Sequence, residues 1–86
     1  MRTIINGKKY DTNTAKLLFS WISKPGLYFR ENSELLYRKE TGEFFLLVSV
    51  LGNKSIAPLT LDEALKWSET HMTVEEYESI IGGVSE

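Results

Sequence analysis

Residues 43–51 read EFFLLVSVL, and this stretch decides the fold class. It is rich in β-forming residues and lacks the alternation of apolar and polar side chains that is typical of a half-buried strand. A strand of this kind needs cover on both faces, or cover on one face and a partner on the other. We therefore expect it to be the central strand of a sheet inside a layered domain.

Shorter strands are expected on both sides of this segment, separated by polar turns. Gly42 suits the left-handed position of a short hairpin loop, since it has no Cβ to clash. Pro58 has no N–H to donate, so the strand that contains it is expected at an edge. The expected strands are 27–30, 34–39, 43–51 and 56–58, with turns at 31–33, 40–42 and 52–55.

The N-terminal part predicts a hairpin followed by a helix. Asn6-Gly7 lies between the short extended runs 2–5 and 8–10, and this dipeptide is the strongest two-residue hairpin signal. Asp11 or Thr12 is a candidate helix start, and residues 23–26 (SKPG) are the expected stop. The apolar residues between them follow helical spacing, although LLFSWI is also compatible with a buried strand. They are Ala15, Leu17, Leu18, Phe19, Trp21 and Ile22.

The C-terminal part carries the pattern Thr-x-x-Glu twice, thirteen residues apart, in PLTLDEALKWSETHMTVEEYESIIGG. Each copy predicts a capping box, in which the threonine and the glutamate bond each other's backbone N–H at a helix start. The first box begins at Thr60 and the second at Thr73, and Gly82 suits the residue after the second helix. We therefore expect one α+β domain over residues 1–86. It should contain an antiparallel sheet of about four to five strands, a short N-terminal helix and two C-terminal helices on one face.

Composition indicates an ordinary globular protein, with 42% hydrophobic and 26% charged residues. The chain has no cysteine, so neither a disulfide framework nor a thiolate metal site is available. The longest apolar run is about a third of a membrane span, and no signal-peptide segment precedes it. These features lead us to expect a cytoplasmic protein.

Catalytic and metal-binding motifs are missing. The sequence has no glycine-rich phosphate loop, no nucleophile elbow and no zinc-protease helix. His71 is the single histidine, and its position at a helix end favours a structural or capping role. The acidic pairs Asp62/Glu63 and Glu75/Glu76 already have a capping explanation. We expect no enzyme, no cofactor and no metal.

Charge is divided unevenly along the chain. Residues 1–60 hold nine Lys and Arg against five Asp and Glu, a balance of +4. Residues 61–86 hold one Lys against seven Asp and Glu, a balance of −6. This asymmetry fits a solvated helix face, or an acidic side that binds a basic partner protein or ribonucleoprotein. The candidate partner-binding residues are Asp62, Glu63, Glu69, Glu75 and Glu76.

Two other functions remain open. Aromatic and basic residues alternate on the expected strands, as in domains that stack nucleic-acid bases on a sheet. That reading uses Arg30, Tyr37, Arg38, Lys39 and Phe45. A free strand edge would instead allow a homodimer, as in a homo-oligomeric accessory protein.

Three segments together resemble a group of short, mostly uncharacterised proteins of Gram-positive bacteria, their phages and mobile elements. The segments are NGKKYDTNTA (6–15), ELLYRKETGEFFL (34–46) and IAPLTLDEALKWSETHMTVEEYESIIGGVSE (56–86). The group's pattern is KKYDTxTA, LYRxxxGxxFL, PLTxxEAxxWxxxH and EYE. This chain departs from it with Ile81 in place of an aromatic residue and with a shorter segment between Val48 and Ile56.

The resemblance implies a mobile-element setting and identifies no active site. Small acidic proteins in that setting often act by stoichiometric binding, and inhibitors of host CRISPR effectors are among them. By that analogy we expect a non-enzymatic anti-CRISPR-type inhibitor of a host nucleic-acid-handling complex.

Overall fold

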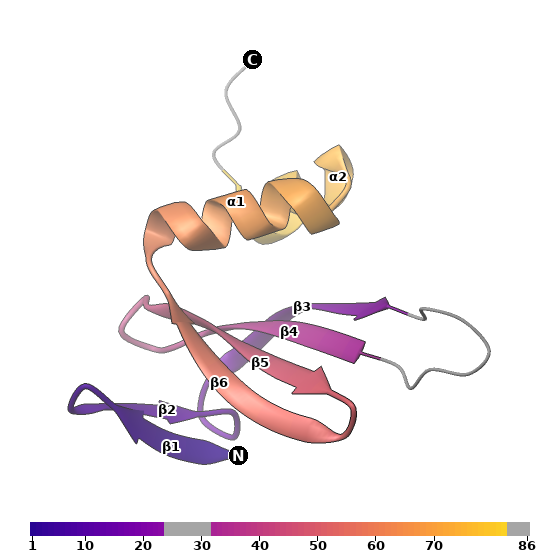
Figure 1. Cartoon of the computed structure of the whole chain (residues 1–86). Coiled ribbons are helices and arrows are strands. Elements are labelled where there is room, and N and C mark those ends of the chain that lie inside the picture. The colour runs from indigo at the N-terminus through magenta and orange to yellow at the C-terminus, as the bar shows by residue number, and fades with distance from the viewer. Residues whose placement is uncertain (24–31, 83–86) are drawn as a thin grey trace.

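The computed structural model describes residues 1–23 and 32–82 and gives them an α+β fold with two antiparallel sheets (Figure 1). The α+β class is confirmed, but the expected single sheet is wrong, because the first two strands form a sheet of their own. The strand expected at 27–30 lies outside the described residues. The elements in chain order are β1 (Arg2–Ile5), β2 (Lys8–Asp11), β3 (Lys16–Ser23), β4 (Asn32–Arg38), β5 (Phe44–Val50), β6 (Asn53–Leu59), α1 (Leu61–His71) and α2 (Val74–Ile80).

β1 and β2 form the predicted hairpin. Asn6 and Gly7 have φ values of 50° and 75°, as a two-residue hairpin turn requires, and Ile5 pairs with Lys8 across it. Asparagine tolerates such a φ and glycine has no Cβ to oppose it. The dipeptide therefore sets the register of the hairpin, and β2 ends one residue beyond the expected boundary.

The second sheet is a meander in the order β3-β4-β5-β6, with every neighbouring pair antiparallel. Gly42 has φ 95° in the turn before β5, as predicted. The next turn is shorter than expected: Leu51 and Gly52 reverse the chain with φ 52° and 82°, and the β5–β6 ladder runs from Val50↔Asn53 to Phe44↔Leu59. The predicted turn at 52–55 and short strand at 56–58 are therefore wrong, because a two-residue turn allows β6 to pair with β5 from Asn53 onward. β6 is an edge strand, as Pro58 predicted.

Of the two arrangements expected for β5, the structure shows cover on both faces. Phe44 and Leu46 belong to a buried cluster with Ala64 and Trp67 of α1. Phe45 belongs to a second cluster on the opposite face, with Tyr10 of the hairpin and Tyr37 of β4. Successive side chains of a strand point to opposite faces, so an apolar run serves both clusters.

The N-terminal helix expected after Asp11 is wrong. Residues 16–23 are β3, paired with β4 from Lys16↔Arg38 to Ser23↔Asn32. The Asp11 carboxylate instead accepts the N–H of Asn13 at 2.9 Å, which makes a turn and starts no helix. Aromatic and β-branched residues fit a pleated surface better than a helix, and pairing with β4 decides the ambiguity.

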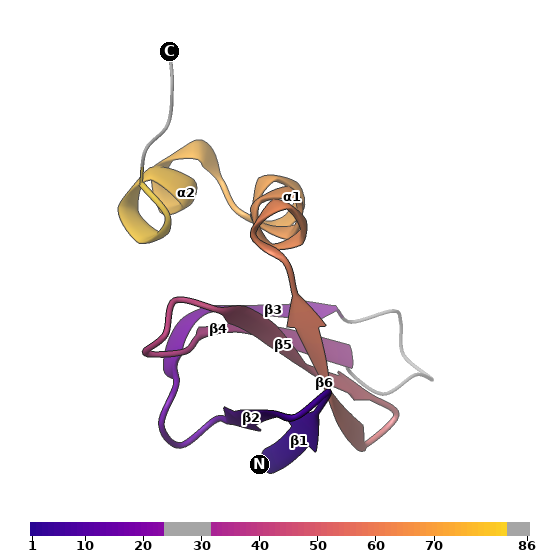
Figure 2. The ribbon, with the colours of Figure 1, turned by 90° about the vertical axis from the view of Figure 1, so that its left-hand side faces the viewer.

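The two predicted C-terminal helices are present, and both lie on one face of the four-stranded sheet, with the hairpin on the other (Figure 2). α1 buries Ala64, Trp67 and Ser68, whereas the shorter α2 fully buries no side chain. Gly82 follows α2 with φ 75° and donates its N–H to the carbonyl of Tyr77, so the predicted helix end is confirmed. Neither described helix has the length and apolar composition needed to cross a bilayer.

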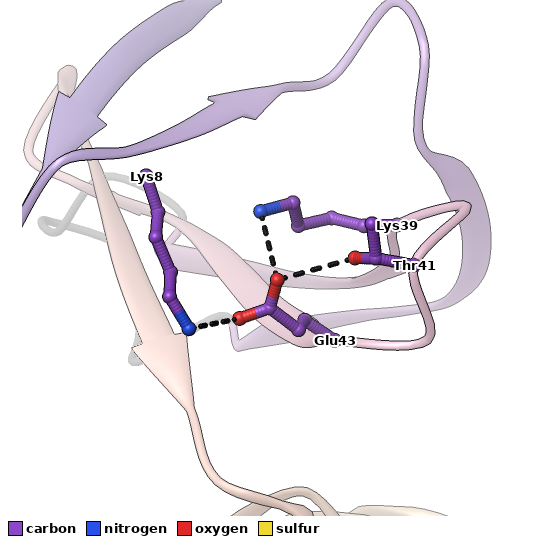
Figure 3. Close-up of polar contacts among 4 residues, drawn as sticks. All are labelled: Lys8, Lys39, Thr41 and Glu43. Atoms are coloured by element: carbon purple, nitrogen blue, oxygen red, sulfur yellow. Dashed lines mark hydrogen bonds and ion pairs between the residues drawn. The ribbon is translucent and has the colours of Figure 1, made fainter.

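Glu43 joins the hairpin to the larger sheet (Figure 3). Its carboxylate accepts from Lys8 Nζ at 2.9 Å, from Lys39 Nζ at 3.2 Å and from Thr41 Oγ1 at 3.1 Å. These hydrogen bonds, above all that from Lys8, lower the pKa of Glu43 to about 2, and the same bond raises the pKa of Lys8. The Lys8 side chain is 59% exposed, so solvent screens the pair and keeps its contribution to stability small.

Candidate protein-binding surface

Both C-terminal helices start with a complete capping box. Thr60 Oγ1 accepts the N–H of Glu63 at 3.2 Å, and the Glu63 carboxylate accepts the N–H of Thr60 at 2.9 Å. Thr73 and Glu76 repeat both bonds at the same two distances. Each box holds one glutamate, and a second acidic residue lies beside it in the first helical turn, where the positive end of the helix dipole favours both.

The capping bonds also bear on protonation. The backbone N–H of Thr60, followed by its hydroxyl, lowers the pKa of Glu63. A lowered pKa keeps this carboxylate charged near neutral pH. Glu63 and Glu76 also hold the helix starts, whereas the other three candidates have no capping bond.

The structure exposes four of the five predicted acidic residues. Asp62, Glu63, Glu69 and Glu75 are exposed, and Glu76 is half-buried. We refer to α1 and α2, which carry these five carboxylates, as the acidic helices. Within residues 1–23 and 32–82, none of the five forms an ion pair with a lysine or arginine. The ion pairs of that part of the chain lie among the strands and their turns: Lys8–Glu43, Lys9–Asp11 and Lys39–Glu43.

Two details of the charge layout come from the structure. Asp62 forms no ion pair with Lys66, although Lys66 lies one turn from Asp62 and one turn from Glu69 on α1. Glu78 is a further exposed carboxylate on α2, three residues after Glu75. The general excess of acid after residue 60 was the available signal for it.

Apolar anchors for a partner are present on both helices. Met72 is not one of them, because it is only 9% exposed and belongs to the core. Leu61 and Val74, the first residues of the two helices, are 60% and 71% exposed. Each precedes an acidic pair, so the sequence Thr-apolar-acid-Glu places an exposed aliphatic side chain beside two carboxylates twice.

A surface hollow of about 710 Å³ lies where the start of α1 meets the hairpin and the β4–β5 turn. Its walls combine apolar side chains with four charged ones, so it can accept an amphipathic side chain. It is lined by Lys8, Tyr10, Arg38, Thr41, Gly42, Glu43, Phe44, Pro58, Leu59, Thr60, Leu61, Glu63 and Ile81. Leu61 and Glu63 connect this hollow directly to the acidic helices.

The aromatic residues of the alternative nucleic-acid site are in the core. Tyr37 is 9% exposed and Phe45 is 0% exposed, and their rings stack on each other with centroids 5.2 Å apart. Neither ring has a free face for a base. Lys39 Nζ lies 4.3 Å from the centre of the Tyr10 ring and also binds Glu43, while Arg30 lies outside the described residues.

Arg38 is exposed, unlike the aromatic residues beside it in the alternative site. Its guanidinium carbon lies 5.5 Å from the centre of the Phe44 ring. Cross-strand pairing sets it opposite Lys16, and like charges directly opposite each other repel. The sheet therefore offers cations to a ligand but no stacking platform.

His71 occupies a structural position between two tryptophans. Its Nδ1 lies 2.8 Å from the carbonyl oxygen of Trp67, and its ring stacks on that of Trp67 and meets Trp21 edge-on. Trp67 Nε1 in turn donates to Glu34 Oε1 at 3.2 Å. No group of three His, Cys, Asp or Glu side chains in the described ranges is placed to hold a metal ion.

Comparison of the chain with models of protein families, with curated proteins and with solved structures found no match. The geometry alone therefore defines the class of protein. It is a small α+β domain whose exposed carboxylates are concentrated on two C-terminal helices.

Proposed function

We propose that this chain is a non-enzymatic modulator that binds a basic surface of another protein through its acidic helices. The observation that carries the proposal is the separation of charge in space. Among the described residues, Asp11 and Glu43 near the strands pair with lysines, while Asp62, Glu69 and Glu75 on the helices have no cationic partner. The most specific form of the proposal is an inhibitor of the anti-CRISPR type, acting on a host nucleic-acid-handling complex in the cytoplasm.

Electrostatics explains why such a partner fits. Proteins that hold a polynucleotide present a groove of lysines and arginines that attracts phosphate. Exposed carboxylates on a rigid helix compete for the same cations and speed association, in a way that falls with ionic strength. Capping boxes keep the first turns of both helices ordered, so less conformational entropy is lost on binding.

Leu61 and Val74 supply the apolar part of the proposed contact. Charge alone gives fast but weak binding, and stable interfaces bury apolar anchors at their centre. Burying one such aliphatic side chain contributes about 1.5–3 kcal/mol. The hollow beside Leu61 offers room for a side chain of the partner at the same place.

The test compares variants that change charge without touching a capping box. Asp62→Asn, Glu69→Gln and Glu75→Gln combined should reduce the association rate for a captured partner about tenfold or more, because steering by charge is lost. Glu69→Lys and Glu40→Lys form a matched pair of single reversals, since Glu40 is an exposed acid in the β4–β5 turn. Only the Glu69 reversal should weaken binding.

Partners are identified by pull-down from host lysate at low and high salt, followed by mass spectrometry and by surface plasmon resonance with the purified partner. The expected partner has a basic groove, and it should bind at low salt but not at high salt. Equal binding by wild type and the triple variant would contradict the proposal. A DNA or RNA mobility shift that Arg38→Ala weakens would support the nucleic-acid alternative in its place.

A further inference from the structure

The outer edge of β3 is the longest strand edge without a partner in the described part of the chain. β3 has eight residues and pairs only with β4, so its other side presents unpaired N–H and C=O groups. Such groups form a template onto which a further strand can add. The residues along an edge decide whether this happens or is prevented.

The opposite edge of the same sheet carries protective features. β6 includes Pro58, which lacks an N–H, and Lys54, whose charge opposes the approach of another strand. β3 has a bulge between Leu17 and Phe19, and its only charged residue, Lys16, stands before that bulge. From Phe19 to Ser23 the edge has neither charge nor proline.

We propose that two copies of this chain pair in antiparallel fashion along their β3 edges, with a two-fold axis at Ser20. The two four-stranded meanders would then form one continuous sheet of eight strands. This inference concerns self-association and does not depend on the proposed function.

A second copy is the occupant because the edge complements itself in this register. Ser20 faces Ser20, and Phe19 of each copy faces Trp21 of the other. Phe19 and Trp21 both pack on the helix side of the sheet, so the paired side chains share a face. Cross-strand aromatic pairs are among the favourable ones, and no like charges meet between Phe19 and Ser23.

Disulfide trapping tests the register, and the chain suits it because it contains no cysteine. Residues directly opposite in an antiparallel pair have Cα atoms about 4.5–5.5 Å apart, which lies within the range that a disulfide spans. Ser20→Cys should therefore give a covalent dimer under mild oxidation. Ser20 is exposed, so the change leaves the core intact.

Two controls separate specific pairing from random collision. Ile22→Cys lies on the same strand and is also exposed, but its two copies would be about 14 Å apart in this register. Ser55→Cys places an exposed thiol on the other edge strand, β6. Ser20→Cys should cross-link about tenfold faster than either control, because pairing raises the effective thiol concentration.

Light scattering after size exclusion provides a readout without covalent chemistry. At chain concentrations on the order of 100 µM, where a small interface is populated, wild type should show twice the 9.8 kDa chain mass. Ser20→Lys places two like charges opposite each other and should give the single-chain mass, whereas Ser55→Lys should remain dimeric. A monomeric wild type, or cross-linking of Ile22→Cys as fast as that of Ser20→Cys, would overturn the proposal.

Discussion

Thr60→Ala and Thr73→Ala remove the same hydrogen bond from two helices that depend on it to different degrees. Each threonine oxygen accepts an N–H at 3.2 Å in an identical capping box. α1 has eleven residues and buries Trp67 and Ala64 against the sheet, whereas α2 has seven residues and fully buries none. The two substitutions should therefore act on different equilibria.

Removing an N-cap side chain typically costs about 1 kcal/mol. α1 cannot unfold without exposing the main core, so this loss should appear in the global free energy of unfolding and lower Tm by about 4–8 °C. A helix as short as α2 is marginal by itself, so Thr73→Ala should mainly increase local fraying. Its effect on the global free energy should stay below about 0.5 kcal/mol.

Urea unfolding followed by circular dichroism measures the global free energy of unfolding. Hydrogen exchange at the amides of α2 measures the local fraying of that helix. Thr70→Ala is the matched control, because Thr70 is an exposed threonine inside α1 that donates to the Lys66 carbonyl and caps nothing. Alanine has the higher helix propensity, so this variant should be no less stable than wild type. An equal loss of global stability in the Thr60 and Thr73 variants would refute the reasoning.

Two further predictions concern the core and the Glu43 contact. Leu36 is 0% exposed, so Leu36→Ala should lower the free energy of unfolding in urea by about 2–5 kcal/mol. Ile4 is 72% exposed, so Ile4→Ala should change it by no more than about 0.5 kcal/mol. Equal losses in the two variants would contradict the assigned core. Glu43 has a pKa of about 2 in the folded chain against 4.5 for an ordinary glutamate, so its contribution to stability is complete above about pH 4.5 and is lost as pH falls towards 2. Glu43→Gln should make the urea midpoint depend less on pH over this range. An unchanged dependence on pH would count against the contact.

Local chemistry explains why much of the fold could be predicted from the sequence. Asn6-Gly7, Gly42 and the two Thr-x-x-Glu boxes each require a particular backbone geometry, and each is found where expected. The apolar run of β5 likewise predicted a central strand, and the structure places it inside the sheet with cover on both faces. These signals act within a few residues, so no knowledge of distant contacts was needed.

Elements that depend on distant contacts were harder to predict. Residues 16–23 satisfy helical spacing and strand propensity alike, and only the ladder with β4 selects the strand. The separate hairpin sheet depends on Tyr10 packing against Phe45, which no local pattern announces. The candidate acidic residues could be predicted from charge alone, but the exposure of Leu61 and Val74 and the burial of Met72 depend on how the helices sit on the sheet.

The meander has a consequence for how the chain acquires its structure. Every strand of both sheets in the described ranges pairs with a neighbour in the sequence, so contact order is low for a protein rich in β-structure. The β1–β2 and β5–β6 hairpins close through turns of only two residues, which limits the chain entropy lost when their strands pair. During synthesis the sheet can assemble hairpin by hairpin as it leaves the ribosome, and the helices then close over a platform that is already formed.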